Sequence, residues 1–490
     1  MKERGITLIA LIVTIIVLII LAGITIATLT GEDGIINNAN NAKEETEIAN
    51  EKEVVDRATI NAMGNNKRGN IVKDELQDEL DRITKVGDTE VEDNGEEFEV
   101  VFVNTNRYYI VDIDGDIIEE GKIVVDKSPG DITKDENGND IEEGQPYEIW
   151  CIEDLVAFSN MVSGSGIIIE NGSPIEVNTS TSFKNAIVEL KTNLNFKSKR
   201  SYVNSERTDF GDINGDDNDG NTLMNEMTTG TGFKPIGESE GKSFAGVFNG
   251  NDYEVQQIYI NQTTNSVGLF GTINNGIIQS LGISGNIICN DTAGGIAGRS
   301  GNSTLIQDCY NKANITSNKN SGGIIGELYN GETTIINCYN DVQSVIKGNH
   351  AGGIIGATRT VGASPCIYNS YNLGNINGSM AGGIIGYVYD HAECINVYTT
   401  GDITGNTVGG IVGSALWNNT SQNKFENCYF LKSDTVQKSS GSKITVNASM
   451  LDNLTDTNIN ELNNYISNNG SLTYKWKNWT LGSNGYPVFI

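Results

Sequence analysis

The sequence predicts a mainly β protein: a C-terminal parallel β-helix (β-solenoid) preceded by a long N-terminal α-helix and a small α+β domain. Three observations predict it. Glycine-rich tracts recur at a nearly constant spacing, and a tyrosine-containing segment recurs between them. Near the start, residues 6–29 contain no charged side chain. Periods of about 20–50 residues are typical of solenoids and other repeat arrays, whereas an unbroken apolar run is typical of a membrane span.

Residues 1–5 form a short charged head, and residues 6–29 are predicted to be a transmembrane helix. At about 1.5 Å per residue these 24 positions reach roughly 36 Å, more than the hydrocarbon core of about 30 Å. A secretory signal has a shorter apolar stretch of about 7–15 residues, so that alternative is not favoured. Because Lys2 and Arg4 precede the run and an acidic remainder follows it, the N-terminus is expected in the cytoplasm and the rest outside.

Residues 30–125 are predicted to continue the helix and to add a small α+β domain. After a glycine break the apolar positions resume as an intermittent stripe, which indicates a helix that packs one narrow face. The stripe contains Ile35, Ala39, Ala42, Ile48, Ala49, Val55, Ala58 and Ala62. Residues 72–83 predict a shorter helix, and alternating apolar positions on either side of NTNR predict a hairpin over 98–113. Residues 126–145 are polar and rich in turn formers, which predicts a linker.

Residues 146–435 are predicted to form the solenoid, with an amphipathic helix over 148–162 as its cap. Its clearest signal is a glycine tract whose starting positions step by 28, 30, 30 and 27 residues. The tracts are GGIAG (294–298), GGIIG (322–326), GGIIG (352–356), GGIIG (382–386) and GGIVG (409–413). The segments between them, such as IINCYN, are marked by Tyr310, Tyr339, Tyr371, Tyr398 and Tyr429.

A unit of about 30 residues with short apolar strands cannot close a core alone, but stacked units form continuous inner ladders. Glycine suits corners that need a positive φ or where backbones crowd, and the asparagine of CYN can form a ladder of its own. We expect roughly ten coils between residues 165 and 435, about 50 Å at 4.8 Å per coil. A propeller or sandwich with glycine-rich turns is the alternative. Residues 436–490 are predicted to be a C-terminal cap with closing strands.

The seven cysteines contain no CxxC pattern, which argues against a metal site or a disulfide framework. Cys309, Cys338 and Cys428 occupy one repeat position, where Ser370 and Val397 stand in other coils. A position that accepts Cys, Ser or Val is small and buried, so stacked free thiols are expected. A disulfide between Cys309 and Cys338 remains the alternative.

Charge excludes one class of partner. The formal net charge is −30, and a surface of this sign repels phosphate backbones, so nucleic acid is not expected as a ligand. No phosphate loop and no nucleophile–base pair stands out, and no cofactor is expected. The periodic GGIxG tracts lack the strand–helix context of a dinucleotide site.

Two acidic stretches have the spacing of calcium ligands. Asp212, Asn214 and Asp216 match the first three positions of a calcium loop, and Glu226 lies near the distance of its closing carboxylate. The sixth position is Asp217 rather than glycine, so an exposed turn-rich insertion is the more economical interpretation. The DIDGD stretch that begins at Asp112 is interpreted as a simple hairpin turn.

The stretch GITLIALIVTIIVLIILAGITI resembles the N-terminal class III signal of type IV pilins and pseudopilins, including those of type II secretion-like systems. The resemblance implies cleavage between Gly5 and Ile6 by a prepilin peptidase, N-methylation of Ile6, and retention of the helix, with other pilin subunits as partners. Ala10 departs from the glutamate usual in the family. In a filament that carboxylate offsets a neighbour's N-terminal amine, so Ala10 favours a minor or tip subunit or a pilin-like anchor.

The GGIIG and CYN repeats resemble the GLUG repeat of bacterial surface proteins, some of which are IgA-cleaving metallopeptidases. Those enzymes need HExxH. His350 and His391 have no Glu-x-x-His beside them, so a peptidase is not predicted. The terminal WTLGSNGYPVFI also resembles the closing strand of such solenoids.

These features predict a cell-surface, non-enzymatic protein: a minor pilin or pilin-anchored adhesin anchored by residues 6–29, with the solenoid as an extracellular binding or spacer rod. The expected ligand is an extracellular protein or glycan, and Trp417, Tyr387 and Tyr389 are candidate contact residues. The alternatives are a membrane-anchored surface protein that never enters a filament and a polysaccharide-acting β-helix enzyme.

Overall fold

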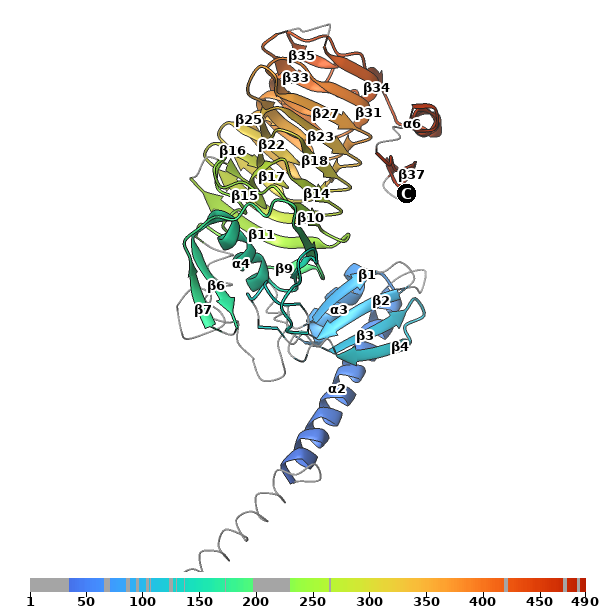
Figure 1. The fold of residues 1–490 in the computed structure, drawn as a ribbon. Helices are drawn as coiled ribbons and strands as arrows, with labels where there is room; N and C mark the ends of the chain where they lie inside the picture. Colours follow the sequence, from blue (N-terminus) through green and yellow to red (C-terminus); the bar gives the residue numbers. More distant parts are fainter. Residues whose placement is uncertain are drawn as a thin grey trace, which may run out of the picture. The chain divides into compact units, whose positions relative to one another are not determined.

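The computed structural model falls into two compact units, residues 1–123 and 124–490, and each is described here by itself (Figure 1). The described residues are 35–65, 71–84, 89–93, 97–102, 105, 107–122, 127–128, 130–135, 137–171, 173–196, 230–263, 266–417, 422–469, 474–482 and 485–490. The predicted span 6–29 lies outside this set, as do Gly5, Ile6 and Ala10. Among the helices within the set, none is both long and apolar enough to cross a membrane.

The first unit packs two helices on a four-stranded antiparallel sheet of order β1-β2-β3-β4. The predicted hairpin over 98–113 is β2 and β3, which pair from Glu97↔Asp112 to Phe102↔Arg107. From the predicted apolar stripe, the last three members, Val55, Ala58 and Ala62, are buried against the sheet. The elements are α2 (Ile35–Asn65), α3 (Lys73–Ile83), β1 (Thr89–Asp93), β2 (Glu97–Phe102), β3 (Arg107–Asp112) and β4 (Ile117–Lys122).

The stretch predicted as a linker belongs to the second unit. The Lys127 ammonium lies 3.0 Å from the Asp154 carboxylate, and both side chains are buried. Asp154 also accepts the N–H of Gly130, and Ile132 is in the core. A polar, turn-rich composition does not reveal such packing, because one buried ion pair and one isoleucine are enough to hold the segment.

Near the start of the second unit, a helix closes the first end of the solenoid interior, as predicted. Helix α4 is buried on nearly all sides, and its Phe158 ring packs within 6 Å of the rings of Phe183, Phe244 and Phe248. The apolar helix thereby shields the open end of the core from water. The elements are β5 (Tyr147–Ile149), α4 (Ile152–Ser163), an antiparallel hairpin of β6 (Gly166–Glu170) and β7 (Ser173–Val177), β8 (Ile187–Leu190) and β9 (Leu194–Asn195).

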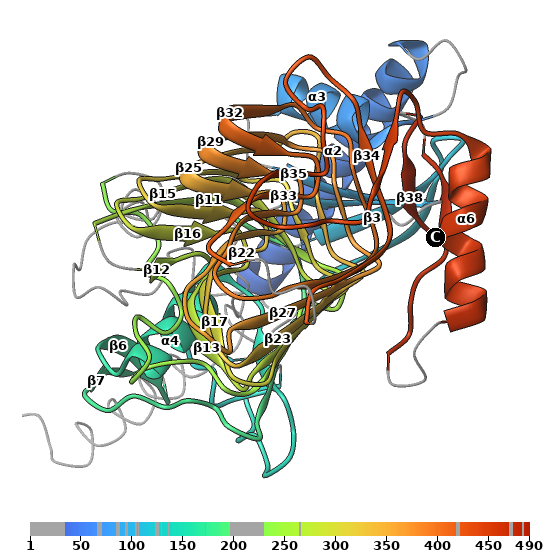
Figure 2. The same cartoon turned by 90° about the horizontal axis from the view of Figure 1, so that it is seen from above.

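The parallel β-solenoid is confirmed. Strands from successive turns pair in parallel and in register, for example Ile325↔Ile355 and Ile355↔Ile385 (Figures 1 and 2). One sheet contains seven strands, one per turn: β13 (Phe270–Asn274), β17 (Ala297–Gly301), β22 (Ile325–Asn330), β26 (Ile355–Thr358), β30 (Ile385–Val388), β33 (Val412–Ala415) and β35 (Ser440–Ser442).

The other walls form one 23-stranded sheet that winds around the stack. Besides β5, β8 and β9 it contains β10 (Val247–Asn249), β11 (Glu254–Gln262), β12 (Ser266–Val267), β14 (Ile277–Gln279), β15 (Gly282–Cys289), β16 (Thr292–Gly294), β18 (Thr304–Gln307), β19 (Tyr310–Asn311), β20 (Asn314–Ser317), β21 (Asn320–Gly322), β23 (Glu332–Ile336), β24 (Tyr339–Asn340), β25 (Val345–Gly352), β27 (Ser364–Tyr368), β28 (Tyr371–Asn372), β29 (Asn375–Gly382), β31 (Glu393–Thr399), β32 (Ile403–Gly409), β34 (Lys424–Leu431) and β36 (Ser449–Leu451).

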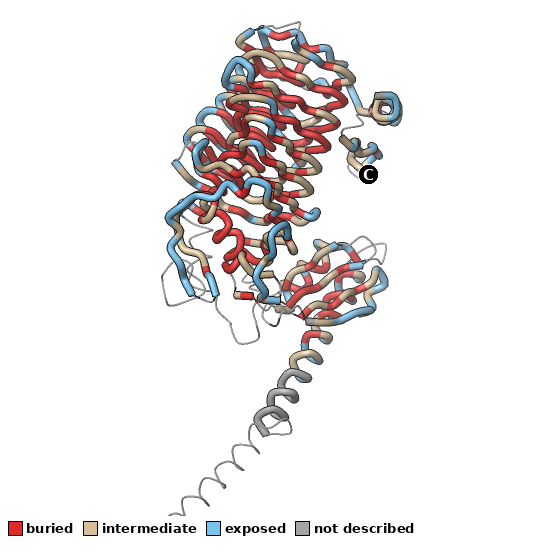
Figure 3. Tube along the Cα trace, in the orientation of Figure 1, coloured by how far each residue is buried: buried red, intermediate tan, exposed pale blue. Residues whose placement is uncertain are grey.

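The predicted number of coils was too high. The seven-stranded sheet counts seven turns over residues 247–442, not ten over 165–435. The difference arises because the described residues of the second unit before β10 form α4, the β6–β7 hairpin and only the short strands β5, β8 and β9. One continuous apolar core nonetheless runs from Ile132 to Val446, and Figure 3 shows it as the buried interior of the stack.

The repeated glycines are required by crowding and not by a positive φ. In GGIIG, a Cβ on Gly352 would lie 1.9 Å from the Ile355 carbonyl oxygen, and one on Gly353 would lie 2.2 Å from the Gly383 carbonyl oxygen in the next turn. Neither glycine has a positive φ. The prediction of crowded corners is therefore confirmed for these tracts, whereas the conformational argument does not apply to them.

The asparagine of CYN forms the predicted ladder inside the solenoid, which we call the buried asparagine ladder. The side-chain amide of Asn311 donates to Asn340 Oδ1 at 2.8 Å, and that of Asn340 donates to Asn372 Oδ1 at 2.7 Å. The amide of Asn372 donates to the Thr399 hydroxyl at 3.0 Å. All four residues are buried, so each amide bonds to the next turn instead of to water.

The cysteines are free and buried, as predicted, and the alternative disulfide between Cys309 and Cys338 is absent. Their thiols donate to backbone carbonyls two residues earlier, Cys309 to Gln307 at 3.1 Å and Cys338 to Ile336 at 3.2 Å. Burial raises the pKa of Cys309 well above its usual value and raises the pKa of Cys428 to about 12.

We therefore expect native protein to resist thiol reagents. The thiolate is the reactive form, and neither burial nor these raised pKa values permit it at pH 8. Incubation with N-ethylmaleimide followed by intact mass spectrometry should show no adduct on native protein and seven adducts after unfolding in urea. Rapid labelling of the native protein at Cys309 or Cys428 would contradict the buried positions.

The last part of the chain folds back along the flank of the solenoid instead of extending its ladders. Strand β36 still pairs with β34, but α6 (Asp456–Asn469) follows it, and β37 (Trp479–Leu481) and β38 (Pro487–Phe489) form an antiparallel hairpin of their own (Figure 2). The resemblance of WTLGSNGYPVFI to a closing strand is therefore not matched by its pairing. Its apolar side chains cover tyrosines of the solenoid wall.

Candidate functional site

Two ladders of side chains line the flank on which the chain folds back. The first, the turn ladder, consists of residues that precede the Leu, Cys, Ser or Val at one position of the repeats and have φ between 46° and 60°. They are Ser280, Asp308, Asn337, Asn369, Asn396 and Asn427. Asparagine and aspartate tolerate this left-handed conformation better than most residues. Their side chains bond along the stack: Asn337 donates to Asp308 at 2.9 Å, and Asn369 donates to Asn337 at 2.7 Å.

The second is the tyrosine ladder, in which one ring per turn stacks on the next. The ring centroids of Tyr310 and Tyr339 are 5.1 Å apart, those of Tyr339 and Tyr371 are 4.8 Å apart, and those of Tyr371 and Tyr398 are 5.1 Å apart. At the lower end the Tyr310 ring covers Gly282, where a Cβ would lie 2.2 Å from the ring. Ring faces are therefore occupied by neighbours, and only ring edges and hydroxyls face outward.

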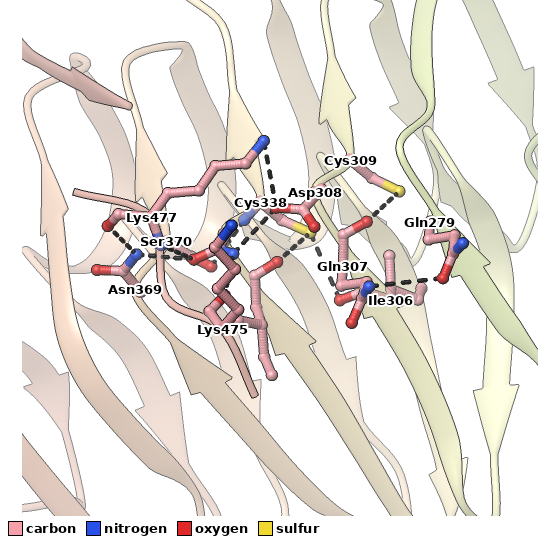
Figure 4. Close-up of polar contacts among 12 residues, drawn as sticks. Gln279, Ile306, Gln307, Asp308, Cys309, Cys338, Asn369, Ser370, Lys475 and Lys477 are labelled. Atoms are coloured by element: carbon pink, nitrogen blue, oxygen red, sulfur yellow. Dashed lines mark hydrogen bonds and ion pairs between the residues drawn. The ribbon is translucent and has the colours of Figure 1, made fainter. Parts of the chain in front are cut away.

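The C-terminal segment, residues 474–482 and 485–490, binds to both ladders. Asn337 donates to the Lys475 carbonyl at 2.9 Å and accepts the Lys477 N–H at 3.1 Å, while Asn369 donates to the Lys477 carbonyl at 2.9 Å (Figure 4). The Trp479 indole donates to Asn369 and packs on Tyr371 with 5.5 Å between ring centroids. The upper part of the flank is thus filled by the protein's own chain.

Below this segment the flank is open, and a cleft of about 320 Å³ remains, which we call the flank cleft. Its polar side chains come from turns of the solenoid and from Lys477 of the C-terminal segment, and its apolar rim comes from the same segment and Leu373. The lining residues are Asp252, Ser280, Asp308, Tyr310, Asn337, Tyr339, Asp341, Tyr371, Leu373, Lys477, Val488, Phe489 and Ile490. Three carboxylates and one ammonium make it acidic, with a formal charge of −2.

Only one of the three carboxylates is paired. Lys477 lies 3.2 Å from Asp308, and Figure 4 shows its side chain reaching that carboxylate. Within the part of the chain that the structure describes, no cation lies within 4.0 Å of the Asp252 or Asp341 carboxylates. Burial raises the pKa values of Tyr339 and Tyr371 well above the usual value, so their hydroxyls stay protonated and can donate hydrogen bonds. The cleft therefore presents free negative charge next to hydrogen-bond donors and apolar edges.

The residues predicted as ligand contacts lie elsewhere. Tyr387 stacks on His350 with 4.7 Å between ring centroids, and His350 in turn bonds to Asn320. Tyr389 is half-buried, and its backbone N–H donates to the Thr358 hydroxyl. Trp417 is 57% exposed and lies one turn above, as the pairing of Val388 with Ala415 requires. None of the three lines the flank cleft.

The calcium candidates Asp212, Asn214, Asp216 and Glu226 lie outside the described residues. In the part that is described, no group of three or more His, Cys, Asp or Glu side chains is arranged to hold a metal ion. In DIDGD, the Asp112 carboxylate accepts the N–H groups of Asp114 and Asp116 at 3.0 and 2.9 Å. That geometry is a hairpin turn, as interpreted from the sequence.

Sequence reasoning did not identify the cleft. The turn ladder has a sequence signal, because an aspartate or asparagine stands before the Cys, Ser or Val in five repeats, and Ser280 stands before Leu281 at the same position. The wall of the cleft that the C-terminal segment contributes has no such signal. Lys475 and Asn337 are 138 residues apart, and no local pattern indicates that contact.

Comparisons with known proteins leave the family open, since no protein-family model matches the chain. Halomucin from Haloquadratum walsbyi (strain DSM 16790 / HBSQ001) is 32% identical over 102 residues, which are 20% of this chain and 1% of halomucin. The chain thus spans about one hundredth of that relative's length.

One solved structure is similar in part. It is described as a "putative immunoglobulin A1 protease" from Bacteroides ovatus, and it covers 71% of this chain and 93% of its own with 20% identity and a TM-score of 0.45. A similarity at this level does not indicate an activity for this chain.

Proposed function

We propose that the chain is a pilin-like cell-surface protein, a minor pilin or a pilin-anchored adhesin, that displays its β-solenoid outside the membrane as a binding and spacer rod. The observation that carries the proposal is the combination of a class III-like signal at residues 1–29 with a seven-turn solenoid whose flank contains a cleft. The action proposed for it is binding and not catalysis.

The anchoring part of the proposal depends on the apolar run. Residues 6–29 contain enough uncharged positions to span a bilayer, and the basic residues before them favour a cytoplasmic N-terminus. A cut after Gly5 by a prepilin peptidase would leave the helix in place. With Ala10 in the position of the usual glutamate, the N-terminal amine of a neighbouring subunit would have no carboxylate partner there. This favours a minor subunit or a lone anchor over a major pilin.

The rod part depends on the way the solenoid is stabilised. Inner strands within the stack pair with the turns above and below, and the buried asparagine ladder adds side-chain bonds at three successive steps. A stack of this kind resists bending because each turn is fixed by its neighbours. It can therefore hold a ligand site away from the membrane. The net charge of −30 keeps such a surface soluble and disfavours nucleic acid.

Processing of the N-terminus tests the proposal. We expect protein purified from the native host membrane to begin at Ile6, with one methyl group on its amine, by Edman sequencing and peptide mass spectrometry. Replacement of Gly5 by leucine removes the residue at the cleavage point and should leave Met1 in place. An intact Met1 in the wild-type protein would exclude the pilin-like proposal and leave a plain membrane anchor. Recovery in sheared surface filaments would separate a filament subunit from a lone surface protein.

A further inference from the structure

The C-terminal segment shows how this flank holds an extended chain. Asn337 and Asn369 bond the backbone of residues 475–477 at alternate positions, so recognition there depends on the main chain. The side chains between them are received separately, with Trp476 stacked on Tyr368 at 5.8 Å between ring centroids. Lys477 extends to the next member of the turn ladder, Asp308, at 3.2 Å. The protein's own Lys–Trp–Lys sequence is thus bound by asparagine amides, an aromatic ring and a carboxylate.

The same features continue into the open flank cleft. The turn ladder proceeds from Asn337 through Asp308 to Ser280, and the tyrosine ladder proceeds to Tyr310 beside it. Asp252 and Asp341 add carboxylates that no described lysine, arginine or histidine approaches within ion-pair distance. The cleft is therefore an unfilled extension of a groove in which a cationic chain segment is already seated.

We propose that the flank cleft binds an extended peptide segment of a partner protein that carries lysine or arginine residues next to an aromatic or aliphatic residue. One cation pairs with Asp341 and a second with Asp252, because these two carboxylates lie three turns apart along the stack, roughly 14 Å at about 4.8 Å per turn, and cannot share a cation. The apolar neighbour packs on Phe489 and Leu373, and the peptide backbone bonds the open side of the turn ladder. This names the ligand class for the binding role proposed above and rests on it, since the cleft meets a partner only if the solenoid is displayed.

The geometry favours a peptide over a glycan. Sugars bind aromatic residues by stacking on a ring face, and in the tyrosine ladder the faces of Tyr310, Tyr339 and Tyr371 are covered by each other or by Gly282. What remains accessible is ring edges, hydroxyls and carboxylates. Negative charge in a partly enclosed cleft attracts a cation more strongly than it attracts neutral hydroxyls.

The test uses the detergent-purified full chain and a fluorescein-labelled peptide of sequence YKWKNW, which copies residues 474–479. Fluorescence anisotropy should show saturable binding that weakens as salt is raised. The Asp252→Asn/Asp341→Asn variant should bind about tenfold more weakly, the sum expected for two solvent-accessible ion pairs. A matched variant, Asp402→Asn/Asp434→Asn, removes the same charge from exposed positions outside the cleft and should bind like wild type.

A second peptide, YEWENW, keeps the aromatic residues and reverses the charge, and it should not bind. Equal affinity of wild type and the Asp252→Asn/Asp341→Asn variant, or equal binding of both peptides, would overturn the proposal. So would a neutral glycan whose binding is lost in that variant, because it would assign the cleft to a sugar. Failure of peptide binding in protein that begins at Ile6 would overturn this inference alone, whereas an intact Met1 would overturn the proposed function instead.

Discussion

Replacing Gly353 with alanine is expected to destabilise the second unit by about 3–5 kcal/mol, among the largest effects for a single methyl group. The new Cβ would lie 2.2 Å from the Gly383 carbonyl oxygen and 2.4 Å from Asn372 Cγ. Both neighbours belong to the buried wall of adjoining turns, so relief requires separating two turns or displacing a ladder amide. Because Gly353 has no positive φ, the backbone itself tolerates alanine, and the cost is steric.

Urea unfolding of the full chain, followed by far-ultraviolet circular dichroism, measures the effect as a lower transition midpoint. Gly241→Ala is the matched control, because a Cβ there meets nothing within 4 Å and that glycine also has no positive φ. The control should stay within about 0.5 kcal/mol of wild type. Equal midpoints for the two variants would show that crowding does not explain the repeated glycines.

Replacing Asn340 with leucine is expected to cost about 2–4 kcal/mol, although the two side chains are similar in size. Asn340 accepts from Asn311 at 2.8 Å and donates to Asn372 at 2.7 Å, and it is fully buried. Leucine would leave one polar atom of each neighbour without its inter-turn partner, in a place that water cannot reach. A threonine at the same position should cost less, because Thr399 already serves as a ladder member in a later turn.

Asn318→Leu is the control, because Asn318 also bonds to the preceding turn, through Asn290 at 3.3 Å, but is exposed. There water replaces the lost bond, and the change in unfolding free energy should stay within about 0.5 kcal/mol. Hydrogen exchange should show the loss in Asn340→Leu as faster exchange in the turns around residues 311 and 372. An equal loss of unfolding free energy in Asn340→Leu and Asn318→Leu would mean that burial of the asparagine ladder does not contribute to stability.

The regular part of the fold was predictable because its cause is local and repeated. GGIxG tracts and tyrosine-containing segments such as CYN recur in successive turns and indicate a stack. The stack requires in-register isoleucines and a buried asparagine ladder, and the structure has both. The number of turns was not predictable in the same way. Among the described residues before 247, many apolar positions belong to α4 and an antiparallel hairpin, and only the short strands β5, β8 and β9 join the parallel stack; composition alone does not distinguish these elements from full coils.

The glycine prediction was only half correct for a physical reason. Positive φ and crowding both select glycine, and a sequence cannot tell them apart. In this solenoid different residues meet the two requirements. Gly352 and Gly353 occupy crowded positions, whereas Asn337 and Asn369 adopt the left-handed backbone conformation.

The sequence by itself determined that the chain repeats, that its repeats stack into a parallel solenoid, and that its cysteines are buried and free. These follow from side-chain type at a fixed period. Only the tertiary structure decided where residues 474–490 pack, that Lys477 meets Asp308, and that an acidic cleft remains beside them. Those contacts join positions that no period relates, so their pairing depends on the complementary shape and charge of surfaces that exist only once the chain has folded.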